Sequence, residues 1–442
     1  MKYFVLLLNI LVILSSTGKI LYAKTDLEYL KFKKGVKELQ FDNGLKLLLK
    51  KDNSHPTVSV QVWVKVGSVN EKPDQRGISH FLEHLIFKGT DKYPGDQISR
   101  CVETQGGVIN AGTSKEFTQY YIDIQKSAYK DAIEILGDVM FNATFPENDI
   151  NKERPVVLEE ITRHTDNPMA VLQDNFSKTM FLKTPYKDNI IGSADVIRKV
   201  SRDEIMDYYK TWYTPDNMIV SIVGDIDTDA ALRLVKQTFG KQKKTGVLKL
   251  PDLKEPFHKE RTSKLKKDVE HSYLLAGFIG PDIKSNDQFI ADITSTILGG
   301  GRSSRLYQSL REEKKLVYNI VSSFWTQRGN GTFIVQSIFD PKNEKEVIAE
   351  IKYAINNLKN EGPSDAELSR AKEIIKTQWF FGLETFYDQA SVLGYWNMQD
   401  YPEILDIYIE SIDNIKKGQV QDFLKKYFDT QGLTYSLISP KK

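Results

Sequence analysis

Residues 77–90 of the chain read GISHFLEHLIFKGT, and the rest of the sequence can be organised around them. The apolar residues of this stretch recur at helical spacing and a glycine stands near each end, so a helix is predicted here. On such a helix His80 and His84 lie one turn apart, with roughly 5–6 Å between their Cβ atoms. Glu83 follows His80 by three residues and projects beside the same face. Two imidazoles can therefore converge on one cation next to a carboxylate.

This arrangement is typical of a zinc hydrolase, in which the carboxylate acts as a base on a water that the metal activates. Only 6 of the 442 residues are histidines, so a chance pair at metal-binding spacing beside an acid is rare. The alternative is that the two histidines are ordinary core or surface residues. We predict metal ligands at His80 and His84 and a general base at Glu83.

Length and composition narrow the class of protein. A chain of 442 residues is too long for one compact core, so two or more domains are expected. Hydrophobic residues make up 40% and charged residues 27%, as in a globular protein. A formal net charge of +2 gives no reason to expect a nucleic acid or an acidic membrane surface as partner. Cys101 is the only cysteine, which excludes an intrachain disulfide framework, and it is expected to be a small buried hydrophobic residue.

The first residues predict a secretory signal peptide at 1–23. A short basic start precedes an apolar run at 3–14, and small residues follow it. Cleavage is expected after Ala23, with Gly18 as a rival position, and the alternative is an uncleaved N-terminal anchor. We therefore expect a periplasmic or secreted protein, attached to a membrane only if the leader is uncleaved.

The remaining chain divides into two similar halves. Residues 24–235 are expected to form a catalytic, zinc-binding domain. Residues 236–270 are rich in lysine, contain two prolines and lack periodicity, which indicates a linker with some extended structure. From 271 to 442 the order of predicted elements returns, which indicates internal duplication. The corresponding helix, 289–298, has no His-x-x-Glu-His, so the second domain is expected to lack a metal site. The predicted class is α+β, with two duplicated α/β-roll domains, each an antiparallel-rich sheet packed with helices.

The individual elements follow from helical and alternating periodicity. Helices are predicted at 78–86, 97–105, 128–140, 147–163, 171–181, 202–213, 289–298, 305–314, 344–357, 365–384 and 417–427. Strands are predicted at 45–49, 58–64, 120–124, 218–223, 272–278, 317–325, 331–338 and 433–438.

A catalytic zinc site takes a third protein ligand, which another element must supply. The best candidate segment is 153–161, where Glu153 and Glu160 stand two helical turns apart on one face. One of them can ligate the metal and the other support it. Spacing alone leaves His164, Glu159 and a solvated acidic face as alternatives to Glu160. Pro155 is compatible with this helix only near its first turn.

These residues resemble the inverted-motif zinc peptidases of the pitrilysin, insulinase and mitochondrial processing peptidase family, of the two-domain bacterial type. The resemblance covers nearly all of the mature chain and includes the whole of 80–90. Glu160 stands 76 positions after His84, which is the family interval for the third ligand. The resemblance implies one zinc ion per chain, held by His80, His84 and Glu160. It also implies a supporting role for Glu153.

Further features resemble the substrate-binding parts of the family. The stretch 107–113 leads into an edge strand that pairs with the substrate backbone in relatives, which implies substrate contacts at Asn110 and Ala111. In the second half, Arg311 and Tyr318 resemble an arginine–tyrosine pair. That resemblance implies that they bind substrate and help to stabilise the developing oxyanion.

The function implied is that of a zinc metalloendopeptidase acting on extended peptides or unfolded polypeptides. Relatives enclose substrate between two two-domain halves, and this chain supplies one such half. A homodimer is therefore expected, in which Arg311 and Tyr318 act on the partner's zinc site. A related non-catalytic partner chain is an alternative, as is a non-catalytic structural role for the chain itself.

Overall fold

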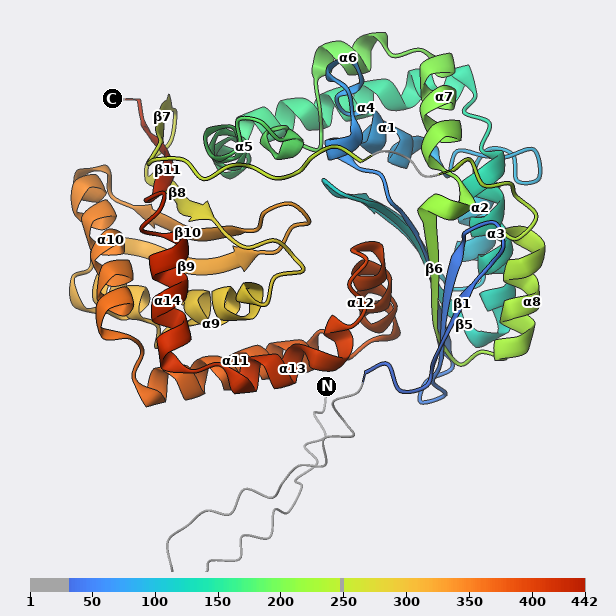
Figure 1. The fold of residues 1–442 in the computed structure, drawn as a ribbon. Coiled ribbons are helices and arrows are strands. Elements are labelled where there is room, and N and C mark those ends of the chain that lie inside the picture. Colours follow the sequence, from blue (N-terminus) through green and yellow to red (C-terminus); the bar gives the residue numbers. More distant parts are fainter. Residues whose placement is uncertain (1–31, 247–249, 442) are drawn as a thin grey trace, which may run out of the picture.

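The computed structural model describes residues 32–246 and 250–441, arranged as two α+β halves side by side (Figure 1). The predicted signal peptide, 1–23, lies outside the described residues. No helix in the described part of the chain is long and apolar enough to cross a membrane. The predicted α+β class is confirmed, because each half is a mainly antiparallel sheet packed with helices.

The sheet of the first half has the strand order β1-β2-β6-β3-β5-β4. Its strands are β1 (Val36–Gln40), β2 (Lys46–Lys51), β3 (Thr57–Val64), β4 (Val108–Thr113), β5 (Thr118–Gln125) and β6 (Met218–Gly224). The pair β2–β6 is parallel and the others are antiparallel. β3 and β6 are central and almost fully buried, whereas β4 is the outermost strand beside the candidate site.

The helices of the first half pack mainly around this sheet. They are α1 (Ile78–Leu85), α2 (Gln97–Glu103), α3 (Tyr129–Asn142), α4 (Glu147–Asp166), α5 (Pro168–Met180), α6 (Ala194–Lys199), α7 (Arg202–Trp212) and α8 (Thr228–Thr238). α3 packs on β3 and β5, while α1 lies against β4, α4 and α7. The short helix α6 and the helix α8 were not predicted from the sequence.

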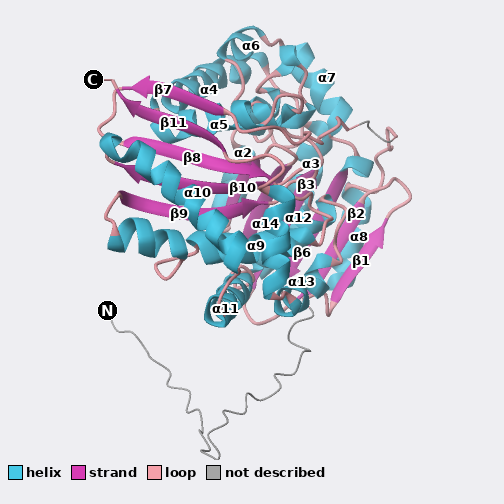
Figure 2. Ribbon diagram, turned by 60° about the vertical axis from the view of Figure 1, so that its left-hand side comes forward, coloured by secondary structure: helices cyan, strands magenta, loops and turns pink. Residues whose placement is uncertain are grey.

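The sheet of the second half repeats the topology of the first, except that β1 has no counterpart. Its order is β7-β11-β8-β10-β9, with a parallel β7–β11 pair (Figure 2). The strands are β7 (Thr262–Lys267), β8 (Ser272–Ile279), β9 (Val317–Trp325), β10 (Thr332–Phe339) and β11 (Thr434–Pro440). The run β8-α9-β9-β10 corresponds to β3-α1-β4-β5, which agrees with internal duplication. The expected linker, 236–270, contributes the edge strand β7.

The helices of the second half include two that the sequence did not predict. The helices of this half are α9 (Asp287–Gly299), α10 (Glu344–Glu361), α11 (Asp365–Phe381), α12 (Phe386–Met398), α13 (Ile404–Asn414) and α14 (Lys417–Tyr427). α12 and α13 were missed, and the helix predicted at 365–384 ends at Phe381. The helix predicted at 305–314 is instead a π-helical segment, Tyr307–Glu313.

One helix from each half packs on the sheet of the other half. α5, from the first half, packs on β8 and β11, while α12, from the second half, packs on β3 and β6. The contact of α12 is partly polar, because Gln61 donates to the carbonyl of Tyr387 at 3.0 Å. Gly394 allows the close approach, since a Cβ there would lie 2.2 Å from Nε1 of Trp63. Neither sheet is therefore covered by its own half alone.

Arg305 and Glu367 form an ion pair that links separate segments of the second half. Arg305 donates to both carboxylate oxygens of Glu367, at 2.6 and 2.9 Å, and to Oδ1 of Asn357 at 2.8 Å. These bonds connect the segment before the π helix with α10 and α11. The bidentate bond from Arg305 lowers the pKa of Glu367 to about 2, from an ordinary value of 4.5.

This pair predicts a defined pH dependence of stability. Because the folded-state pKa of Glu367 is depressed, its contribution is full above pH 4.5 and is lost as the pH falls towards about 2. Glu367→Gln is expected to lower the free energy of unfolding at pH 7 by about 1–2 kcal/mol, since solvent partly screens the pair. Urea unfolding should show this difference shrinking between pH 4.5 and 3. The exposed Glu346 on α10 provides a control, since Glu346→Gln should change the free energy of unfolding little anywhere in this pH range.

Candidate active site and metal centre

The helix α1 presents its two faces to different surroundings. Ile78, Phe81, Leu82 and Leu85 are buried in the core of the first half. The other face carries His80, Glu83 and His84, which are only partly buried. Because apolar burial fixes the rotation of the helix, it also fixes the direction of the two imidazoles. Their ring centroids lie 4.8 Å apart.

Glu160 from α4 completes a cluster of three ligand-type side chains. Its Oε2 lies 3.6 Å from Nε2 of His80 and 3.4 Å from Nε2 of His84. Tetrahedral zinc with bonds of about 2.0–2.1 Å places its donor atoms roughly 3.3–3.4 Å apart. Two imidazole nitrogens and one carboxylate oxygen are also the donor types of catalytic zinc sites. The three residues therefore fit a zinc ion that keeps one position for water.

The imidazole of His80 is suited to metal binding without prior loss of a proton. Burial, together with the neighbouring His84, lowers the pKa of His80 to about 4. At neutral pH the ring is therefore uncharged and has a lone pair available. Its Nδ1 is buried and has no hydrogen-bond partner among the described residues.

His84 is oriented by a short chain of polar contacts. Its Nδ1 lies 3.0 Å from Oε1 of Glu153, and Nζ of Lys88 lies 2.6 Å from Oε2 of the same carboxylate. Burial opposes ionisation of Glu153, but the bonds from Lys88 and His84 hold its pKa below the usual range. A carboxylate behind a ligating imidazole fixes the tautomer and the ring orientation. Glu153 lies where a supporting residue is needed, and Lys88 is a contact that sequence reasoning missed.

Glu83 stands beside the cluster without joining it. Its Oε2 accepts a hydrogen bond from the hydroxyl of Thr113, on β4. Burial raises the pKa of Glu83, so its carboxylate holds a proton more readily than an exposed glutamate does. Thr113 ends the stretch 107–113 that the sequence singled out, but no local signal indicated its contact with Glu83.

The packing of α4 decides which of its candidate side chains lies beside the imidazole pair. Its buried Val157 lies between Glu153 and Glu160 on the face towards α1, and Arg154 lies over the ring of Phe81. Pro155 is the ninth residue of α4, so the expectation of a first-turn proline is wrong. The tertiary packing of this helix accommodates a proline inside it.

The rival residues lie elsewhere. Glu159 is exposed and lies 4.0 Å from Arg163 on the same helix. His164 contacts Asp174 at 2.9 Å, at the junction of α4 and α5. Neither belongs to the cluster of possible metal ligands.

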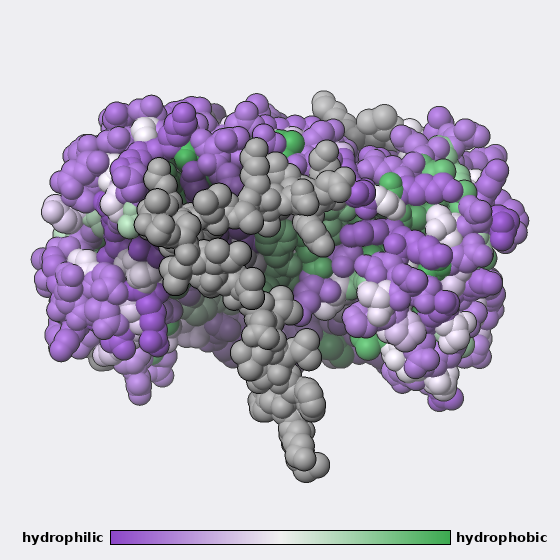
Figure 3. All heavy atoms as spheres, turned by 90° about the horizontal axis from the view of Figure 1, so that it is seen from below, coloured by the Kyte–Doolittle hydropathy of each residue, from purple (hydrophilic) through white to green (hydrophobic). Residues whose placement is uncertain are grey.

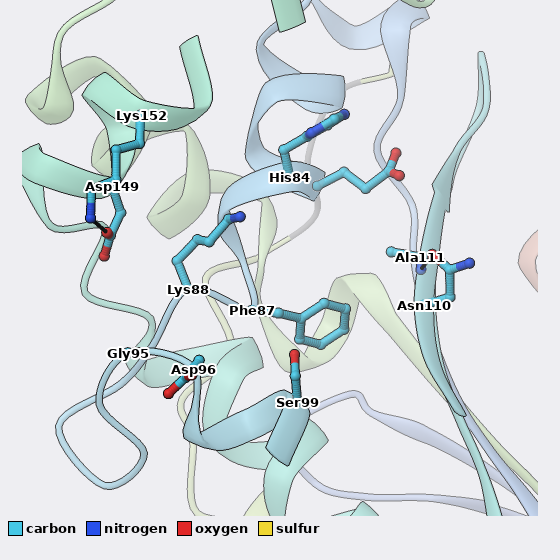
Figure 4. A pocket seen from close by; sticks show the side chains of 11 residues that line it. His84, Phe87, Lys88, Gly95, Asp96, Ser99, Asn110, Ala111, Asp149 and Lys152 are labelled. Atoms are coloured by element: carbon cyan, nitrogen blue, oxygen red, sulfur yellow. Dashed lines mark hydrogen bonds and ion pairs between the residues drawn. The ribbon is translucent and has the colours of Figure 1, made fainter. Parts of the chain in front are cut away.

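A cleft of about 560 Å³ opens beside the cluster. Figure 4 shows His84, Phe87 and Lys88 on one side and Asn110 and Ala111 of β4 on the other. β4 pairs with β5 along one edge, and its other edge has no partner strand in the described ranges. The backbone of β4 is therefore available to a further strand at the side of the cleft.

Arg311 and Tyr318 are not brought to this cleft. Arg311 belongs to the π-helical segment and donates to the carbonyl of Val317 at 3.4 Å. Tyr318 lies on β9, half exposed, with its ring against His271. Neither residue lines the cleft beside Glu83.

Family models match both halves of the chain. The model of the insulinase family, peptidase family M16, matches residues 46–194. The model of the peptidase M16 inactive domain matches residues 199–375. The boundary between them lies within α6, and the first match contains His80, Glu83, His84 and Glu160.

Similar sequences and structures are named as proteases. The uncharacterized zinc protease YmxG of Bacillus subtilis (strain 168) is 30% identical over 407 residues, covering 92% of this chain and 98% of that protein. Zinc protease PqqE of Helicobacter pylori is 30% identical over 403 residues, covering 89% and 91%. The crystal structure of a protease from Helicobacter pylori has a TM-score of 0.85 at 28% identity, over 92% and 99% of the two chains.

A longer protein shares the fold. The periplasmic protease PqqL from Escherichia coli has a TM-score of 0.77 at 19% identity, over 92% of this chain and 48% of that one. The present chain thus matches about half of that longer chain.

Proposed function

The chain belongs to the insulinase family of peptidases, family M16, and on that premise we propose that it is an exported zinc metallopeptidase. Its substrates are extended peptides or unfolded polypeptides. The observation that carries the proposal is the convergence of His80, His84 and Glu160, with Glu83 beside them and outside the ligand set.

The residues divide the chemistry among them. His80, His84 and Glu160 would hold one zinc ion per chain, which would supply a Lewis acid and lower the pKa of a water molecule. Glu83 takes the proton from that water as it attacks the scissile carbonyl carbon. The same carboxyl then gives the proton to the nitrogen of the leaving amine. Thr113 holds the Glu83 side chain in place.

Substrate binding follows from the free edge of β4. An extended peptide can add to this edge through backbone hydrogen bonds at Asn110 and Ala111, largely independent of its side chains. The neighbouring cleft, with Phe87 in its lining, can take one substrate side chain. This mode favours extended or unfolded polypeptides, because a folded chain does not offer a free strand.

A homodimer completes the site in this proposal. Seen from below, apolar residues are visible near the middle of the molecule, between the two halves (Figure 3). The match to about half of the longer protease PqqL supports a chamber made of two such units. Arg311 and Tyr318 would then reach the zinc site of the partner and stabilise the developing oxyanion. A related non-catalytic partner chain remains the alternative assembly.

Mixing two inactive variants tests the assembly. A Glu83→Gln chain retains Arg311, and an Arg311→Ala chain retains Glu83, so a mixed dimer contains one complete site. Cleavage of a labelled peptide is expected to recover towards one half of the wild-type activity per mixed dimer. The control is a mixture of Glu83→Gln chains carrying two different tags, which should stay inactive. A mixed dimer that forms without recovering activity would refute action between chains.

Metal analysis combined with a peptide-library digest tests the function itself. Stoichiometric zinc and chelator-sensitive cleavage are expected for the purified mature chain. A chain that binds no zinc and cleaves no peptide would instead be a non-catalytic subunit. Export is tested by locating the protein in cell fractions, where a cytoplasmic mature chain would contradict it.

A further inference from the structure

A buried carboxylate binds backbone N–H groups at the N-terminal end of α1, the helix that carries the metal motif. Glu71 is 4% exposed and lies in the loop between β3 and α1. Its Oε1 accepts the backbone N–H of Ser79 at 2.8 Å, and its Oε2 accepts that of Gly77 at 2.9 Å. The first N–H groups of a helix have no partner within the helix. Gly77, the residue before α1, has no side chain to satisfy them, so Glu71 does so from outside.

The same loop also binds the turn after β4, the strand on whose edge the substrate would lie. The backbone N–H groups of Ser68 and Val69 donate to the carbonyls of Ser114 and Lys115, at 3.3 and 2.9 Å. These carbonyls belong to the turn that directly follows β4. The contact is close, since a Cβ on Gly67 would lie 2.3 Å from the carbonyl oxygen of Ser114. Residues 67–71 therefore touch α1 at one end and the β4–β5 turn at the other.

The relative position of these two elements matters for the proposed reaction. α1 carries both imidazoles and Glu83, while β4 carries Thr113 and the edge on which the substrate would lie. Displacements of about 1 Å in such an arrangement cost large factors in rate. The contact between Thr113 and Glu83 joins β4 to α1 directly. The loop 67–71 joins them a second time, because it binds the start of α1 and the turn after β4.

We propose that Glu71 is a positioning residue, which sets the start of α1 against the end of β4 and so aligns His80, Glu83 and His84 with the substrate strand. The inference rests on the proposed peptidase function. A carboxylate suits this role because it offers two acceptor oxygens for two converging N–H groups. Burial raises the pKa of Glu71 to about 7, while the two N–H groups favour its ionised form. Glutamine would keep one acceptor and turn an NH₂ donor towards the other N–H.

Another buried glutamate in the same chain provides a matched control. Glu255 is also 4% exposed, and its carboxylate accepts backbone N–H groups of residues 182–184 at 2.9 to 3.3 Å. Its hydrogen bonds from these residues involve neither α1 nor β4. Glu71→Gln and Glu255→Gln therefore make the same chemical change at equally buried sites, one next to the motif helix and one away from it.

The test measures zinc affinity by competition with a chelator, and kcat and KM on a labelled peptide. Glu71→Gln is expected to raise the dissociation constant for zinc and to lower kcat/KM, each by about 10–100-fold. Glu255→Gln is expected to lower the thermal midpoint while both quantities stay within about twofold of wild type. Thermal unfolding of both variants measures the shared structural cost.

The outcomes separate this inference from the function on which it rests. Wild-type zinc affinity and kcat/KM in folded Glu71→Gln protein would overturn the inference and leave the peptidase intact. An equal loss of zinc affinity in Glu255→Gln would also overturn it, because the effect would then be one of general stability. A wild-type chain without zinc or cleavage would remove the proposed function instead. If Glu71→Gln does not fold, Glu71→Asp, too short to reach both N–H groups, replaces it with the same expectations.

Discussion

Glu83→Gln is expected to lower kcat for peptide hydrolysis by roughly 10²–10⁴-fold while zinc stays bound. Glutamine has nearly the same size and can still accept the hydrogen bond from Thr113, but it cannot take a proton from water. Glu83 does not belong to the cluster of His80, His84 and Glu160, so its change leaves the donor set complete. The measurements are kcat on a labelled peptide and zinc content by metal analysis.

Two controls make the Glu83 result specific. Glu159→Gln changes an exposed glutamate on α4 and should leave kcat unchanged. Thr113→Val removes the bond to Glu83 without removing the base, and a smaller loss of kcat is expected. Peptide hydrolysis near the wild-type rate in purified Glu83→Gln protein would show that another group handles the proton.

Removal of the third ligand is the second large effect. Glu160→Ala leaves only the imidazoles of His80 and His84, and we expect the dissociation constant for zinc to rise by more than about 100-fold. That exceeds the 10–100-fold typical of residues behind the ligands, because a direct bond to the ion is lost. Cleavage should disappear at limiting zinc. Competition with a chromogenic chelator measures the affinity, and circular dichroism checks that α4 stays helical.

The neighbouring residue on α4 is the matched control for this change. Glu159→Ala removes the same side chain one position earlier, where it points away from the cluster. Zinc affinity in that variant should equal that of wild type. If Glu160→Ala keeps wild-type affinity, or if Glu159→Ala loses it, the assignment of the third ligand is wrong.

The predictable part of the site is the part that lies within one helix. His80, Glu83 and His84 follow one another at spacings that place them on one face, and the apolar residues between them predict the helix. The α+β class and the repeated order of elements also follow from local patterns. The number of residues between His84 and Glu160 pointed to Glu160 only through the resemblance to known peptidases.

Other features could not be predicted, because they arise where distant elements meet. The helices α12 and α13 were missed, and α12 packs partly through polar contacts on β3, a strand more than 300 residues away, where Gln61 bonds to Tyr387. The roles of Lys88, Thr113 and Glu71 depend on neighbours that sequence spacing does not reveal. Pro155 shows the reverse case, since packing of α4 overrode a local preference.

The amino-acid sequence by itself determined the motif helix, its two imidazoles and the carboxyl group beside them, because i, i+3 and i, i+4 geometry is a property of any helix. Only the tertiary structure decided which of three acidic or imidazole side chains on α4 meets that pair. Burial of Val157 turns α4 so that Glu160 faces α1 while Glu159 faces solvent, and a rotation of about 100° separates the two. Which side chain of α4 meets the imidazole pair is therefore set by which face of the helix is buried in the core.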